Sequence, residues 1–222
     1  MYAILSSMHE DSILLVDKPA NMTSFGVVAR IRRRLSQQLG KKAKVGHTGT
    51  LDPFATGLMI IVTGKECRNA MQYSKLDKEY EATIRLGQAS TTGDPEGEVT
   101  DVSDMQPSRE EIEAALGAFR GEISQTPPIY SAIKVNGQRA YKLARKGEVV
   151  EMPVRQVTVF KLEIIDYNYP ELRVRAHVSS GTYIRTLAQD IGAALGTGAY
   201  CTALRRTKVA EYSVVGALQP ED

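Results

Sequence analysis

One carboxylate, Asp52, lies in a segment that is otherwise rich in glycine and threonine. The segment covers residues 46–57 and has the sequence GHTGTLDPFATG. Pro53 holds the residue before it in an extended conformation, and the glycines allow tight turns or the close approach of a ligand. A carboxylate presented in this way could act as a nucleophile or a base, or it could only cap a turn. The segment alone leaves both alternatives open.

The chain before Asp52 is strongly basic. From Lys18 to Leu51 it holds eight Lys or Arg residues and no Asp or Glu, whereas residues 94–113 hold eight acids and one Arg. The net charge of +2 therefore hides two regions of opposite sign. A nucleic acid would be steered to the basic region, although a solvated helix face is the alternative. Three residues near the C-terminal end offer a further flank for phosphates: Arg205, Arg206 and Lys208.

Two more groups could contribute to a site around Asp52. Tyr183 and Arg185 follow a Gly-Thr pair, and at the end of a strand their side chains would point the same way. The guanidinium could then pair with Asp52 and keep it ionised. Tyr80 stands at the start of a predicted strand, where its ring could project into a cleft. The alternative in each case is an ordinary surface Arg and a packed Tyr.

Metal and nucleotide chemistry are not indicated. His47 has only two other histidines as companions, and the two cysteines, Cys67 and Cys201, are too few for a zinc site or a disulfide framework. We therefore expect a hydrogen-bonding or RNA-contact role for His47. The glycines at positions 57 and 64 are too widely spaced for a phosphate-binding loop of the P-loop type.

The composition is typical of a globular protein. The chain has 222 residues, of which 42% are hydrophobic and 24% charged, so it could form one large domain or two small ones. Its N-terminus lacks the pattern of a secretory leader, and no apolar run approaches the ~20 residues needed to span a bilayer. We expect a cytoplasmic protein with reduced cysteines and no membrane partner.

The hydrophobic pattern predicts more strands than helices. Alternating or continuous apolar runs predict strands at residues 12–16, 58–63, 79–86, 154–165, 172–178 and 203–209. Helices are expected at residues 23–35, 66–74, 108–120 and 183–195. Strands joined by hairpins with few helices favour the α+β class with a mainly antiparallel sheet.

Local signals sharpen three of these elements. The first helix should bury one face made of Phe25, Val28, Ile31 and Leu35. Ser108 and Glu111 form a capping box that opens the third helix, and Gly121 should stop it. An Asn-Gly pair at residues 136–137 predicts a tight hairpin.

Taken together, the motifs resemble one family. Residues 46–57 resemble the catalytic motif of the TruB family, the bacterial tRNA pseudouridine synthases. Four other stretches resemble its remaining motifs, in the family's order: residues 78–80, 125–134, 181–187 and 204–206. The resemblance spans nearly the whole chain. It implies a pseudouridine synthase fold, with a mixed, mainly antiparallel central sheet and flanking helices and loops.

The resemblance also implies a reaction and a role for each candidate residue. The family isomerises uridine 55 in the T-loop of tRNA after the base is flipped into a pocket. Asp52 would be the nucleophile and Arg185 its partner. The resemblance further implies that Tyr80 stacks on the base, Tyr183 lines the pocket, Leu204 contacts the base, His47 enters the vacated T-loop space and Arg68 occupies a usually basic position. No cofactor or metal is implied, and we expect a monomer whose partner is the T-arm of tRNA.

The sequence departs from the family pattern at one end. Many members continue into a small RNA-binding PUA domain, whereas this sequence stops at Asp222. We therefore expect residues 1–222 to form a single catalytic domain without a PUA domain, with the basic segment of residues 125–150 as a possible RNA-clamping insertion. Two alternatives stay open: a non-catalytic tRNA-folding chaperone, and a guide-RNA-dependent synthase acting on other RNAs.

Overall fold

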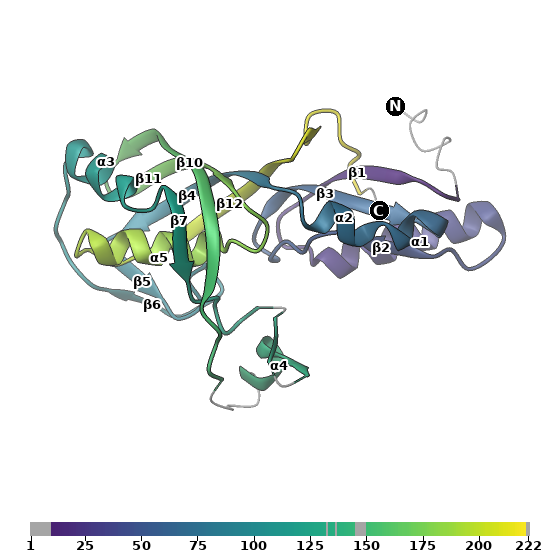
Figure 1. The fold of residues 1–222 in the computed structure, drawn as a ribbon, viewed down its shortest axis with the longest axis horizontal. Helices are drawn as coiled ribbons and strands as arrows, with labels where there is room; N and C mark the ends of the chain where they lie inside the picture. The colour runs from purple at the N-terminus through teal and green to yellow at the C-terminus, as the bar shows by residue number, and fades with distance from the viewer. Residues whose placement is uncertain (1–9, 132, 136, 145–149, 221–222) are drawn as a thin grey trace. The chain divides into compact units, whose positions relative to one another are not determined.

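The computed structural model describes residues 10–220 except 132, 136 and 145–149 (Figure 1). The chain divides into two compact units. The first unit is Met1–Tyr80 with Leu204–Asp222, and the second unit is Glu81–Ala203. Two strands, β4 (Lys78–Leu86) and β12 (Ala199–Val209), contribute residues to both.

The first unit is built around β3 (Thr56–Thr63), whose side chains are almost all buried. β1 (Ile13–Lys18) and β2 (Val45–His47) both pair with it antiparallel. The β12 residues Arg205 and Arg206 pair with the start of β3 in parallel. Because neighbouring strands cover both edges and helices cover both faces, β3 is a continuous apolar run rather than an alternating one.

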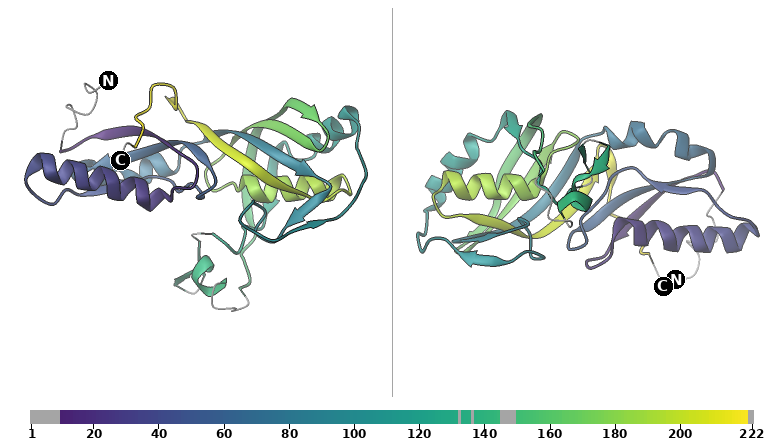
Figure 2. Two further views of the ribbon diagram at one scale, coloured as in Figure 1. Left: turned by 180° about the vertical axis from the view of Figure 1, so that it is seen from behind. Right: turned by 90° about the horizontal axis from the view of Figure 1, so that it is seen from below.

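Helices enclose this small sheet. α1 (Ser24–Leu39) lies on one face, and the turn η2 (Gly64–Arg68) with α2 (Ala70–Ser74) lies on the other (Figure 2). β13 (Tyr212–Ser213) pairs with the end of β12. Alternate side chains of β3 form a core with the end of β12 on the α2 side: Leu58, Ile60, Val62 and Val209.

The second unit is an antiparallel sheet with two covering helices. β10 (Arg155–Asn168) pairs with β11 (Glu171–Val178) on one side and β7 (Gly121–Gln125) on the other. α5 (Ile184–Ala194) turns seven buried residues inward, and α3 (Arg109–Gly117) contacts both α5 and β10. β4 alternates buried and partly buried residues along its whole length, as expected of a strand with one face on the core.

Three smaller elements complete the second unit. β5 (Gln88–Ser90) and β6 (Val99–Asp101) form a two-stranded ribbon. β8 (Lys134–Val135) and β9 (Gln138–Arg139) form the hairpin expected at the Asn-Gly pair, with Gly137 at φ 82°. α4 (Ala140–Ala144) follows directly. Among the described residues the sheet is mixed and mainly antiparallel, which confirms the predicted α+β class.

Most predicted elements exist, but several bounds were wrong. The first helix runs four residues beyond the expected end and stops at Gly40, which adopts a left-handed conformation at φ 64°. The last long strand begins at Ala199 rather than 203. α3 ends at Gly117 rather than 120. The short strands β2, β5, β6, β7 and β13 and the helix α4 were not predicted, because elements of two to five residues are too short to show a clear period.

The face of α1 is a further correction. Its buried residues are Ser24, Val27, Val28, Ile31 and Leu35, whereas Phe25 is 66% exposed. Periodicity placed Phe25 on the apolar face because an aromatic ring is more hydrophobic than the serine beside it. The helix is rotated so that the hydroxyl of Ser24 points inward instead, where it is hydrogen-bonded to Leu51.

The capping box of α3 is present as predicted. Ser108 Oγ accepts from the Glu111 N–H at 3.2 Å, and the Ser108 N–H donates to the Glu111 carboxylate at 2.7 Å. The second bond lowers the pKa of Glu111. Two of the backbone donors at this helix end are satisfied in this way.

We expect Ser108→Ala to lower the melting temperature by about 2–4 °C, since losing an N-cap costs about 1 kcal/mol in a chain of this size. Ser108→Asp keeps an acceptor at the same position and should melt near the wild-type temperature. Thermal unfolding followed by circular dichroism provides the comparison. Equal melting temperatures for the alanine variant and the wild type would show that the cap contributes nothing.

Candidate active site

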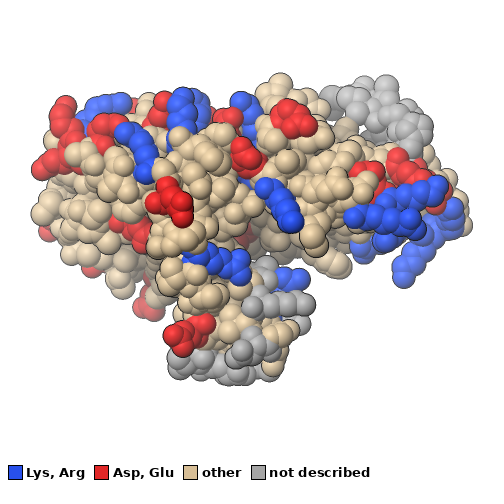
Figure 3. Space-filling view, viewed as in Figure 1, with Lys and Arg blue, Asp and Glu red and all other residues tan. Residues whose placement is uncertain are grey.

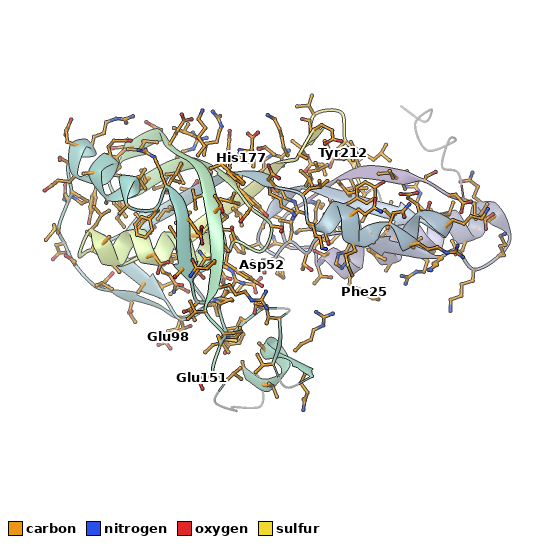
Figure 4. The ribbon with its side chains drawn as sticks, viewed as in Figure 1. Phe25, Asp52, Glu98, Glu151, His177 and Tyr212 are labelled. Atoms are coloured by element: carbon orange, nitrogen blue, oxygen red, sulfur yellow. The ribbon has the colours of Figure 1, made fainter. Side chains whose placement is uncertain are left out.

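Asp52 lies on the connection between β2 and β3, within residues 48–55 (Figure 4). Its side chain is partly buried, while its neighbour Leu51 is buried. The Asp52 carbonyl accepts from the Ala55 N–H at 3.2 Å, which closes a tight turn around Pro53. The Pro53 carbonyl accepts from the Asn21 N–H at 2.9 Å. The Pro53 carbonyl therefore attaches the turn to the segment that precedes α1.

Two side chains from the N-terminal part of the unit hold this loop. Ser24 Oγ accepts from the Leu51 N–H and donates to the Leu51 carbonyl, each at 2.8 Å. Lys18 is fully buried, and its Nζ donates to the carbonyls of Met22 at 2.6 Å, Pro19 at 2.9 Å and Pro53 at 3.0 Å. Backbone that belongs to no sheet thus gains partners from buried side chains, as buried polar groups require.

Arg206 holds the loop from the other side. It is only 2% exposed. Its Nε donates to the Leu58 carbonyl at 2.7 Å, Nη2 to the Gly49 carbonyl at 3.1 Å and Nη1 to the Thr50 carbonyl at 3.4 Å. One guanidinium therefore links the backbone before Asp52 to the strand after it.

Gly57 makes this arrangement possible. A Cβ at this position would lie 2.3 Å from the Arg206 carbonyl, and the residue adopts φ 105°. Both observations demand glycine, because β12 approaches β3 too closely for a side chain.

The predicted phosphate flank near the C-terminal end is therefore wrong for Arg206, whose side chain is buried against backbone. The other two members are half-exposed and engaged in ion pairs. Arg205 pairs with Asp17 at 2.7 Å, and Lys208 pairs with Glu79 at 2.9 Å. A sequence shows only the charge of an arginine, not whether backbone carbonyls surround it.

Four other predicted site residues lie in the first unit. His47 is the last residue of β2 and is partly buried, and Arg68 is the last residue of η2 and is exposed. Tyr80 and Leu204 lie on β4 and β12, which are neighbours in the sheet, and both are buried. The roles inferred for these four residues stay predictions.

Lys78, two residues before Tyr80, was not identified from the sequence. It is buried, and its Nζ donates to the carbonyls of Ser74, at 2.7 Å, and Leu76. Burial lowers the pKa of Lys78 to about 8, and the charge of Arg206 adds to this effect. Its signal in the sequence was only a lysine at a strand start, which is typical of a solvated position.

The lowered pKa of Lys78 predicts a pH dependence of stability. Between pH 8 and its ordinary value near 10.5, the unfolded chain binds the proton more tightly than the folded chain. Stability therefore rises with pH in this window. Relative to Lys78→Met, the wild type should gain roughly 2 kcal/mol in unfolding free energy from pH 8 to pH 10. Denaturant unfolding at both pH values measures the difference, and parallel pH profiles for the two proteins would contradict it.

The second unit contributes the predicted residues Arg185 and Tyr183. Arg185 lies on the first turn of α5 and is 3% exposed. Its Nη1 pairs with the Asp94 carboxylate at 2.8 Å and donates to the Thr92 carbonyl, while Nη2 donates to the Tyr130 carbonyl at 2.9 Å. The predicted pairing of Arg185 with Asp52 stays a prediction.

Asp94, the buried partner of Arg185, was not identified from the sequence. It is buried, and its second oxygen accepts from the Thr92 hydroxyl at 2.6 Å and the Glu96 N–H at 3.0 Å. A buried ion pair is stable only when its remaining lone pairs are satisfied in this way. Its one signal was a Gly-Asp-Pro turn within an acidic stretch, which also suits a solvent-exposed loop.

Tyr183 is the N-cap residue of α5 rather than the end of a strand. The strand alternation that placed it on the same side as Arg185 therefore does not apply. The side-chain amide of buried Gln125 accepts a hydrogen bond from the Tyr183 N–H at 2.7 Å and donates one to the Tyr183 carbonyl at 3.1 Å. The Tyr183 side chain packs on a small core formed by Ile133, Ala140 and Met152. Part of the proposed clamping segment thus contacts Tyr183, although residues 132, 136 and 145–149 of that segment lie outside the described part.

Among the described residues, no group of three or more His, Cys, Asp or Glu side chains is arranged to hold a metal ion. No helix in the described ranges is long and apolar enough to cross a membrane.

Family models match nearly the entire chain. Residues 33–184 match the model of the TruB family pseudouridylate synthase N-terminal domain. Residues 185–220 match the model of the tRNA pseudouridylate synthase B C-terminal domain.

Curated relatives agree with this match. The tRNA pseudouridine synthase B of Phocaeicola vulgatus is 46% identical over 96% of this chain and 91% of its own length. The enzyme of the same name from Opitutus terrae is 46% identical over 94% of this chain and 85% of its own length.

Solved structures share the fold. A protein in an H/ACA RNP bound to a substrate RNA containing 2'-deoxyuridine has a TM-score of 0.69 and 26% identity, over 95% of this chain and 51% of that chain. This chain therefore spans about half the length of that protein. A crystal structure of a pseudouridylate synthase, at TM-score 0.50 and 17% identity over 97% of this chain and 70% of that chain, supports the fold alone.

Proposed function

Because this chain belongs to the TruB family of pseudouridine synthases, we propose that it isomerises uridine 55 in the T-loop of tRNA to pseudouridine. The relatives that match it over most of both chains are tRNA pseudouridine synthases B. The observation that carries the proposal is the loop of Asp52, which presents one partly buried carboxylate and is held by Ser24, Lys18 and Arg206.

The reaction needs few groups, because it moves bonds within one nucleotide. The bond from ribose C1′ to uracil N1 breaks, and a bond from C1′ to C5 forms. The C5 proton leaves and N1 gains a proton, so no group donor is consumed. The uracil must leave the stacked T-loop to reach the protein.

Asp52 is the nucleophile in this proposal. It could attack the uracil ring, attack ribose C1′, or promote a glycal intermediate by removing a proton. All three routes need an ionised carboxylate in a defined place. The anchored turn at Pro53 supplies the place, and Arg185 supplies the positive charge that favours ionisation.

The remaining site residues hold the flipped nucleotide. Tyr80 stacks on the base near the proton that moves, and Leu204 contacts the base beside it. Tyr183 lines the pocket, and His47 enters the space that the uridine leaves in the T-loop. Arg68 contributes positive charge near the RNA.

The partner is the T-arm of tRNA, which the basic region before Asp52 attracts through its phosphates. We also propose that the protein works in the cytoplasm as a monomer without metal or cofactor. These points extend the family assignment and each needs its own measurement.

The two alternatives differ in product and substrate. A chaperone would bind and refold tRNA without making pseudouridine. A guide-dependent synthase would need a second RNA to find its target. The curated tRNA pseudouridine synthases B are 46% identical over most of both chains, whereas the RNP protein is 26% identical. This difference favours direct action on tRNA over guide-dependent action.

Unmodified tRNA incubated with the protein should gain pseudouridine at position 55, mapped by chemical probing or mass spectrometry. Asp52→Asn should reduce the single-turnover rate by at least about 10⁴-fold, since the nucleophile is lost. Asp104→Asn removes an equal charge at an exposed position in the second unit and should keep the wild-type rate.

Each outcome of this assay separates the proposed function from an alternative. If the wild-type protein binds tRNA but makes no pseudouridine, the chaperone alternative is favoured. If it makes pseudouridine only with an added guide RNA, the guide-dependent synthase is favoured. Product from Asp52→Asn at the wild-type rate would refute the nucleophile assignment.

A further inference from the structure

A largely exposed aromatic ring stands on the surface beside the Asp52 loop. Phe25 lies on the first turn of α1 and is 66% exposed (Figure 4). Full burial of a phenylalanine side chain stabilises a fold by about 1.5–3 kcal/mol, and most of this stabilisation is absent at this position. Single exposed apolar residues are common, but this one has an arginine and the Asp52 loop as neighbours.

The position of Phe25 is fixed relative to the catalytic loop. Its neighbour Ser24 shares two hydrogen bonds with Leu51, the neighbour of Asp52. Counting covalent and hydrogen bonds along this path, the Cα atoms of Phe25 and Asp52 are separated by no more than about 14 Å. That distance is within reach of one RNA loop that places its target nucleotide at Asp52.

A cation lies over the ring. The guanidinium carbon of Arg32 is 6.0 Å from the ring centroid of Phe25, at the edge of the cation–π range. Arg32 also donates to the Val45 carbonyl at 2.9 Å. Val45 opens β2, the strand that ends at His47. Phe25 and Arg32 therefore form a surface beside the strand that carries a second predicted RNA contact.

The segment that carries this surface has charges of one sign, although Glu10 from outside it pairs with Lys41 at 2.8 Å. The sequence from Lys18 to Leu51 has no Asp or Glu, and the exposed residues near α1 include Arg33, Lys42 and Lys44. Lys and Arg side chains crowd the end of the first unit where α1 lies (Figure 3). An apolar or acidic-peptide partner would use only part of this surface, whereas a single-stranded nucleic acid offers both a base to stack and phosphates to pair.

We infer that Phe25, with Arg32 over its ring, is a stacking platform for one unpaired base of the T-loop while the target uridine occupies the pocket at Asp52. This inference rests on the proposed function, since it takes the T-arm as the substrate. It adds a second base contact outside the pocket, which would fix the register of the loop and so select which uridine reaches Asp52.

The first test measures binding of a T-arm hairpin to Phe25→Ala by fluorescence anisotropy, in an Asp52→Asn background so that no product forms. The dissociation constant should rise about tenfold, the loss typical of one base–aromatic stack. Phe25→Trp should bind as tightly as the parent. Phe160→Ala removes another exposed ring, 54% exposed on β10 beside His177, and should leave the dissociation constant unchanged.

The second test identifies the base by a double-mutant cycle. A series of hairpins carries one abasic nucleotide at each loop position in turn. At one position the abasic hairpin should lose as much affinity as Phe25→Ala, and combining both changes should cost no more than either alone. At the other positions the losses should add.

Two results would overturn the inference. One is a dissociation constant for Phe25→Ala within twofold of the parent, or an equal loss for Phe160→Ala. The other is additivity at every loop position. Absence of pseudouridine from the wild-type protein would instead defeat the proposed function, and the binding cycle would still report on Phe25 independently.

Discussion

The guanidinium of Arg206 is the interaction on which the rest of the site depends. It donates to carbonyls of Gly49, Thr50 and Leu58, on both sides of Asp52. The loop cannot satisfy the Gly49 and Thr50 carbonyls through a sheet, because residues 48–55 belong to no strand. An unpaired buried carbonyl costs about 1–3 kcal/mol. The loop conformation that presents Asp52 is therefore stable only with Arg206 in place, and Gly57 is required to let β12 come close enough.

The same solution recurs around the other candidate residues. Lys18 satisfies the carbonyls of Pro19, Met22 and Pro53. Gln125 satisfies both backbone groups of Tyr183, and Arg185 bridges Asp94 to two carbonyls. Each is a buried polar side chain that replaces a missing backbone partner. Irregular backbone allows functional side chains to leave the sheet, and these buried groups keep that backbone rigid. Rigid support is what a nucleophile needs if it is to meet a flipped base in one orientation.

Sequence reasoning found the elements whose signals are local. The capping box of α3, the alternation of β4 and the Asn-Gly hairpin all depend on residues close in sequence, and all are present. It failed where a contact between residues far apart in sequence decides whether a side chain is buried. Phe25 faces solvent because Ser24 bonds Leu51, 27 residues away. Arg206 is buried because its partners lie about 150 residues earlier, and Asp94 is buried because Arg185 meets it across 91 residues. No local pattern encodes such contacts.

The central claim is that Arg206 holds the loop in the geometry that presents Asp52. The most direct test is the single-turnover rate of pseudouridine formation with saturating T-arm RNA, measured for Arg206→Lys and for Arg205→Lys, with folding of both checked by circular dichroism. Lysine keeps the charge but cannot reach three carbonyls at once. We predict a rate about 100-fold lower for Arg206→Lys, since a small misplacement of a reacting group can cost that much, and near wild-type for Arg205→Lys. A folded Arg206→Lys protein with the wild-type rate would contradict the account.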